Sequence, residues 1–168
     1  MGAVTYPHQQ VADFVSERFV ALKLNVKERH PDFKEALGRG KVLWAPLFVF
    51  LDGHGSELRR YVGFLPPDEF LAELRLVLGL SAMTHGNYEE ALRWFDGAAE
   101  EYPASSAAPE ALFWAAGAGY RLRGLAEVVR RWDDLIARYP ESTWARRADV
   151  VPDEVRAKIA TEVAEAAG

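Results

Sequence analysis

The sequence predicts an α+β fold over residues 1–79, followed by an α-helical fold over residues 80–168. Strand-forming runs and Gly/Pro turns dominate the first part, whereas Ala, Glu and Arg at helical spacing dominate the second. The charge changes at the same place, because the first part carries 10 basic and 10 acidic side chains and the second carries 10 and 15. These shifts together place a domain boundary near residue 80.

The composition limits the class of protein. Of the 168 residues, 49% are hydrophobic and 27% are charged, which indicates a soluble, globular chain and not a disordered one. The net charge of −5 argues against nucleic acid as a partner. No apolar stretch approaches the ~18 residues that would predict a membrane span, and no export signal is present, so we expect a cytoplasmic protein. The absence of Cys excludes thiol nucleophiles, disulfides and thiolate metal sites within this chain.

The first part begins with alternating helix and strand. The helical spacing of apolar residues predicts a helix over residues 9–18. The apolar and β-branched run Phe19–Val26 predicts a strand. Pro near the start and Gly after the end predict a second short helix over residues 31–37.

A hairpin and a long helix complete the first part. Leu47–Leu51 is predicted as a buried strand, Asp52–Gly55 as the turn and Glu57–Val62 as the return strand. A helix is expected to begin near Pro67 and to run to about His85, where it also serves as the first helix of the second part. Because no spacer rich in Gly, Ser or Pro separates the two parts, we expect a rigid junction.

Three short phrases follow the order of these elements: Trp44-Ala45-Pro46, Phe48-Val-Phe-Leu-Asp52 and Val62-Gly-Phe-Leu-Pro-Pro67. Together they resemble the portion of the thioredoxin fold that follows its active-site motif, over about residues 4–79. The resemblance implies a cis peptide bond before Pro46 and, beside it, an edge that accepts an extended peptide by strand addition. It also implies an incomplete unit, because the family's central strand and Cys-x-x-Cys motif are missing here. The alternative is that Pro46 only shapes the entry to its strand.

A repeat marks the second part. The phrase Gly86-Asn-Tyr-Glu-Glu-Ala91, with Phe95 and Tyr102-Pro103, resembles a tetratricopeptide repeat, in which small residues let two helices cross and aromatic residues fill the gap. Tyr102-Pro103 recurs as Tyr139-Pro140, 37 residues later, so we expect a second and looser copy of the repeat. Residues 144–167 are then expected to form capping helices with a solvated outer face.

No motif predicts catalysis, a cofactor or a metal. Gly38-Arg39-Gly40-Lys41 lacks the spacing and the Ser or Thr of a phosphate-binding loop and is interpreted as a turn. The four His are scattered beside turns, and no pair has the spacing of metal ligands. Neighbouring acids such as Asp133 and Asp134 point apart on a helix, which is typical of a solvated face.

The second part offers two kinds of candidate binding residue. Seven arginines lie between Arg121 and Arg147, and they indicate either charge pairing between neighbouring helices or a groove for an acidic peptide. Four residues, Leu76, Leu80, Met83 and Trp114, are expected on the inner surface of the repeats, although residues of these types at helical spacing more often belong to a core. The full set of peptide-binding candidates is Trp44, Ala45, Pro46, Leu80, Met83, Trp114 and Arg121.

Three hypotheses of function follow. The leading one is a non-catalytic protein-interaction module, whose helical repeats and cis-proline edge bind a protein or peptide. The second is a piece of a thiol-disulfide oxidoreductase whose strand and Cys-x-x-Cys motif lie upstream of this sequence. The third is a self-assembling scaffold, a homo-oligomer in which a second chain pairs with the open strand edges.

Overall fold

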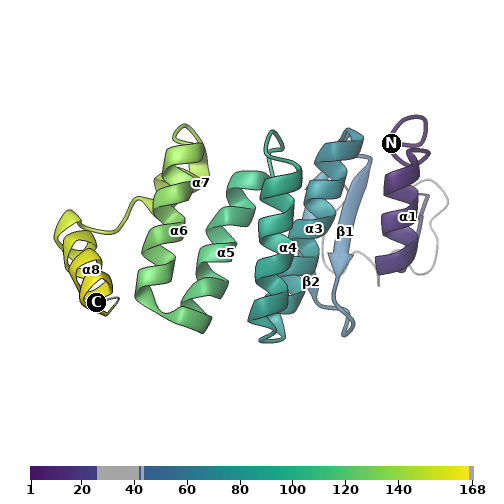
Figure 1. Ribbon diagram of the computed structural model, residues 1–168. Coiled ribbons are helices and arrows are strands. Elements are labelled where there is room, and N and C mark those ends of the chain that lie inside the picture. Colours follow the sequence, from purple (N-terminus) through teal and green to yellow (C-terminus); the bar gives the residue numbers. More distant parts are fainter. Residues whose placement is uncertain (26–41, 43, 167–168) are drawn as a thin grey trace. The chain divides into compact units, whose positions relative to one another are not determined.

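The computed structural model describes residues 1–25, 42 and 44–166 (Figure 1). It divides into two compact units, Met1–Leu71 and Ala72–Gly168. Helix α3, Pro67–Thr84, is continuous across this division, and the predicted boundary near residue 80 falls in the same helix. The predicted helix from Pro67 to about His85 is thereby confirmed.

The N-terminal unit contains helix α1, Gln9–Arg18, and a hairpin of strands β1, Leu47–Leu51, and β2, Glu57–Val62. The strands are antiparallel, with Leu47 opposite Val62. The Asp52 carboxylate fixes the turn between them, because it accepts hydrogen bonds from the backbone N–H groups of His54 and Ser56, both at 2.8 Å. These elements confirm the helix, the two strands and the turn predicted for this part of the chain. The predicted burial of Leu47–Leu51 is wrong, because the strand is only half-buried and Leu51 is 44% exposed, as an antiparallel strand with a solvated face can be.

The core of the N-terminal unit is aromatic. Phe48 and Phe50 are two residues apart on β1, so they lie on the same face of the hairpin and stack with a centroid distance of 6.4 Å. On that face Phe48 also contacts Phe70 of α3, at 5.2 Å, and Tyr6, at 6.5 Å. The buried hydroxyl of Thr5 adds a hydrogen bond to the carbonyl of Leu65 at 2.5 Å.

The strand predicted over Phe19–Val26 is wrong for residues 19–25, which form no strand, and Val26 lies outside the described residues. Val20 and Leu22 are 103% and 66% exposed. A segment becomes a strand only when a neighbour accepts its backbone hydrogen bonds, and in the described structure the sheet consists of β1 and β2 alone. The β-propensity of this run cannot replace that partner. The helix predicted over residues 31–37 and the turn predicted at Gly38–Lys41 also lie outside the described residues.

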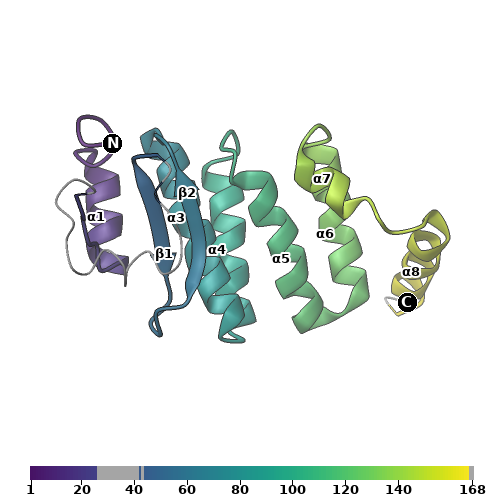
Figure 2. The same ribbon diagram turned by 180° about the vertical axis from the view of Figure 1, so that it is seen from behind.

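The C-terminal unit is helical and continues from Ala72 onward in α3. Helices α4, Tyr88–Glu101, α5, Ala108–Arg123, and α6, Leu125–Arg138, follow one another side by side in both views (Figures 1 and 2). The short α7, Thr143–Ala148, and α8, Asp153–Ala166, follow and confirm that residues 144–166 contain two helices, while Ala167 lies outside the described residues. None of the helices in the described residues is long and apolar enough to cross a membrane.

The 37-residue recurrence in the sequence is also a structural recurrence. Helices α4 and α6 have 14 residues each. Their C-caps, Tyr102 and Tyr139, adopt nearly the same backbone angles, φ −129° and ψ 57° against φ −134° and ψ 55°. Three residues after each Tyr, a Ser hydroxyl accepts a hydrogen bond from a backbone N–H in the first turn of the next helix. Ser105 accepts from Ala108, and Ser142 accepts from Ala145.

Gly79 explains how closely α3 and α4 pack. A Cβ on Gly79 would collide with the ring of Phe95, which is fully buried on α4. Phe95 and Leu76 belong to the main hydrophobic cluster of this unit, together with small residues such as Ala91 and Ala111. The small side chains let the helix backbones approach, and the aromatic ring fills the space that remains.

Candidate functional site

Alternate helices of the C-terminal unit touch one another and form two layers. In one layer, the terminal methyl of Met83 on α3 lies close to Gly117 on α5, where an added Cβ would be 3.2 Å from it. In the same layer, Trp114 on α5 is 6.4 Å from Trp144 on α7, measured between ring centroids. In the other layer, the guanidinium of Arg131 on α6 bonds the Asp96 carboxylate on α4, at 2.7 and 3.2 Å.

The first layer brings together four of the predicted binding residues. Leu80, Met83 and Trp114 are half-buried and pack on the main hydrophobic cluster. Leu76, expected on the same surface, is instead fully buried within that cluster, so it belongs to the core. Trp114, Gly117 and Arg121 are spaced by three and four residues along α5, which places them on one side of that helix. We call the surface formed by Leu80, Met83, Trp114, Gly117 and Arg121 the α3–α5 face.

Two polar interactions fix the side chains of the α3–α5 face. The indole N–H of Trp114 donates to the Glu110 carboxylate one turn earlier, at 3.3 Å. The guanidinium of Arg121 lies 5.1 Å from the ring centroid of Tyr88, at the start of α4, and is exposed. The α3–α5 face therefore combines the Trp114 indole, positioned by its hydrogen bond to Glu110, with the Arg121 cation, which contacts the Tyr88 ring. The sequence analysis did not name Tyr88 or Trp144 as binding candidates, although Tyr88 contacts Arg121 and Trp144 lies near Trp114. Their aromatic side chains are the feature that could have indicated them.

The other three predicted residues belong to the N-terminal unit. The Ala45–Pro46 peptide bond is cis, which confirms this expectation. Trp44 is 70% exposed. The carbonyl of Pro46 accepts a hydrogen bond from the N–H of Gly63 at 2.9 Å, so the chain before β1 is tied to the chain after β2.

Four of the seven arginines in the stretch, Arg123, Arg130, Arg131 and Arg138, pair with carboxylates. Glu127 accepts hydrogen bonds from Arg123 at 3.2 Å, from Arg130 at 2.8 Å and from Arg131 at 2.7 Å. The bond from Arg130 is the largest of the effects that lower the pKa of Glu127 to about 2, from its ordinary value of 4.5. Arg123 on α5 and Arg131 on α6 thus reach carboxylates on other helices, as the charge-pairing alternative predicts, whereas Arg130 pairs with Glu127 within α6.

The chain contains no Cys, and among the described residues no group of three or more His, Asp and Glu side chains is placed to hold a metal ion. On the α3–α5 face, half-buried apolar side chains lie beside the exposed guanidinium of Arg121.

Comparison with known proteins gives no relative: no family model, no curated protein and no solved structure matches the chain.

Proposed function

We propose that the protein is a non-catalytic interaction module that binds a peptide segment of a partner protein on the α3–α5 face. The observation that carries this proposal is the juxtaposition of Leu80, Met83 and Trp114, from two separate helices, with the exposed cation of Arg121 beside them. The resemblance to tetratricopeptide repeats and the 37-residue recurrence of helices and caps support it.

The chemistry of the face specifies the peptide. Met83 offers a flexible thioether, which adapts to different apolar side chains, and Trp114 offers a broad ring held by its bond to Glu110. Arg121 would pair with a carboxylate of the peptide at the edge of this apolar surface. The preferred segment therefore has an apolar residue with an acidic residue nearby.

The cis-proline edge is a second strip for the same function. Trp44 is exposed beside Ala45 and Pro46, and an extended peptide would add to this edge through backbone hydrogen bonds. This strip lies in the N-terminal unit and is tested independently of the α3–α5 face, by the substitution Trp44→Ala.

The experiment is a peptide-array screen with the full chain, followed by affinity measurements on the selected peptides. Arg121→Glu is expected to weaken binding by about tenfold or more, because it turns an attraction for the peptide carboxylate into a repulsion. Arg93→Glu is the matched control, since Arg93 is exposed on α4, in the other layer. If the array selects no peptide, or if both charge reversals have the same effect, the proposal is wrong.

A further inference from the structure

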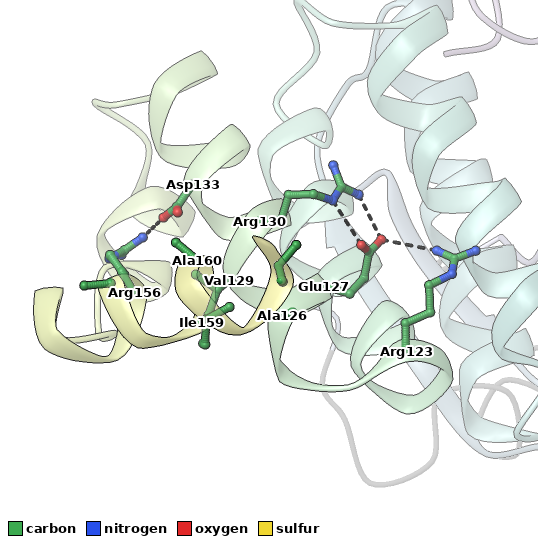
Figure 3. A pocket seen from close by; sticks show the side chains of 11 residues that line it. Arg123, Ala126, Glu127, Val129, Arg130, Asp133, Arg156, Ile159 and Ala160 are labelled. Atoms are coloured by element: carbon green, nitrogen blue, oxygen red, sulfur yellow. Dashed lines mark hydrogen bonds and ion pairs between the residues drawn. The ribbon is translucent and has the colours of Figure 1, made fainter. Parts of the chain in front are cut away.

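A second surface of the helical unit, separate from the α3–α5 face, has the features of a binding groove. It lies between α6 and α8, beside the end of α5, and encloses about 790 Å³ (Figure 3). Its apolar wall is formed by Ala126 and Val129 of α6 and by Ile159, Ala160 and Val163 of α8. A groove of this size is within the range of binding sites in proteins.

The groove has exposed cations at one end. Arg123 and Arg130 line it with side chains that are 59% and 63% exposed, whereas the carboxylate they share, Glu127, is only 11% exposed. Glu127 also pairs with Arg131, which in turn pairs with Asp96. This cluster holds three cations against two carboxylates, and its most exposed members are Arg123 and Arg130, since Arg131 is only 14% exposed. Asp134, whose charge also acts on Arg130, is itself paired with Arg138.

The guanidinium groups retain hydrogen-bonding capacity toward a ligand. Each guanidinium has five N–H donors, and Glu127 accepts one from Arg123 and two from Arg130. An incoming carboxylate could thus bridge Arg123 and Arg130 without displacing Glu127. Such charge-assisted bonds are stronger than bonds between neutral groups.

The other end of the groove holds one cation against two carboxylates. Arg156 of α8 pairs there with Asp133 of α6 (Figure 3). The Arg156 guanidinium also lies 3.7 Å from the Asp149 carboxylate. The excess positive charge is thus confined to the end near Arg123 and Arg130. A bound molecule would be oriented, with its acidic part at that end.

The apolar wall is incompletely covered. Val155, Ile159 and Val163 recur every four residues on α8, and Val155 and Ile159 pack against the cluster that contains Val128 and Val129. Val163, one turn further along, lines the groove and remains 52% exposed. The small side chains of Ala126 and Ala160 leave room for another backbone to approach between the two helices.

We propose that this groove binds an acidic amphipathic helix of a partner protein. The helix would lie along α6 and α8, with its apolar side chains against Val129, Ile159 and Val163 and an Asp or Glu at the Arg123–Arg130 end. The elongated apolar wall between two helices favours a helix as the occupant, since helices pack in this way through apolar stripes. The excess of exposed cations supplies the charge complementarity.

The test is selection from a library of helical peptides with a fixed apolar stripe and randomised polar positions, using the full chain. We expect Asp or Glu to be enriched at one end of the selected helices and their affinity to fall with added salt. Val163→Ser and the double variant Arg123→Gln/Arg130→Gln are each expected to weaken binding by about tenfold. Lys158→Glu is the control, because Lys158 is 77% exposed on α8 and does not line the groove.

Failure of this proposal can be distinguished from failure of the proposed function, because Arg121→Glu should leave binding of the selected helices to the α6–α8 groove unchanged. Circular dichroism checks that each variant folds, and Val163→Ser replaces a half-exposed side chain, so it keeps the test independent of the arginine pairs. The proposal is overturned if selected helices lack an enriched acid, or if Val163→Ser binds them as the unaltered chain does. The proposal is also overturned if the groove binds a fatty acid, tested with decanoate, while no helix is selected. It is likewise overturned if the chain dimerises and Val163→Ser abolishes the dimer.

Discussion

The contacts that stabilise the N-terminal unit join residues farther apart in the sequence than the contacts that stabilise the helical unit. In the N-terminal unit, Thr5 bonds the carbonyl of Leu65, 60 residues away, and the hairpin packs on Phe70. In the helical unit, caps such as Ser142 act within three residues, and links from α6 and its C-cap reach back 35 to 39 residues, close to the 37-residue recurrence. Tyr139, for example, donates to the carbonyl of Pro103, 36 residues away. A repeat array can therefore be built step by step, whereas the N-terminal unit needs distant segments to meet first.

The largest expected loss of stability comes from truncating a core aromatic residue, and it compares how tightly the two cores are packed. Phe95 is fully buried among α3, α4 and α5, so Phe95→Ala should lower the free energy of unfolding by about 3–5 kcal/mol. Phe48 is only half-buried in the aromatic core of the N-terminal unit, so Phe48→Ala should cost about 1–2 kcal/mol. Denaturant unfolding followed by circular dichroism measures both. Equal losses would contradict the view that the helical unit has the tighter core.

A smaller effect tests the close approach of α3 and α4. Gly79→Ala places a methyl group against the Phe95 ring and should destabilise the protein by about 1–3 kcal/mol, despite the better helix propensity of Ala. Gly97→Ala, on α4, is the matched control. The nearest atom to its new methyl is a carboxylate oxygen of Glu101 at 3.5 Å, so this variant should gain about 0.5–1 kcal/mol. Thermal melts of the two variants should shift in opposite directions, and a shared direction would refute the packing argument.

The difference between local and long-range contacts also explains which elements could be predicted from the sequence. Helices α4 to α8 and the β1–β2 hairpin depend on local spacing, caps and a turn, all of which are visible in the sequence. The segment Phe19–Val26 shows the limit, because its strand-like composition says nothing about whether a neighbour is present to pair with it.

The candidate sites show the same limit. The spacing of Leu80, Met83 and Trp114 indicated a shared surface, because the repeat specifies which helices are neighbours. The groove between α6 and α8 could not be predicted, since it depends on where α8 docks, and the apolar stripe of Val155, Ile159 and Val163 does not determine that position. The arginine stretch indicated charge pairing but not the concentration of three guanidinium groups on Glu127.

The smallest expected effect compares one carboxylate in each unit. Glu127 is 11% exposed and pairs with three arginines, so Glu127→Gln should cost about 1–2 kcal/mol near neutral pH. Glu57 in the hairpin is 40% exposed and pairs with Arg60, so Glu57→Gln should cost ~0.5 kcal/mol or less. The hydrogen bond from Arg60 also lowers the pKa of Glu57.

The pH dependence follows from the lowered pKa of Glu127. Because the folded protein holds this pKa at about 2, against 4.5 ordinarily, the stabilisation is fully present above pH 4.5 and is lost as the pH falls through 2. The difference in unfolding free energy between the unaltered chain and Glu127→Gln should therefore shrink over that interval, whereas added salt should reduce the Glu57 effect more than the Glu127 effect. Urea unfolding at a series of pH values measures this difference. A difference that stays constant down to pH 2 would mean that the arginine cluster does not stabilise the charged form of Glu127.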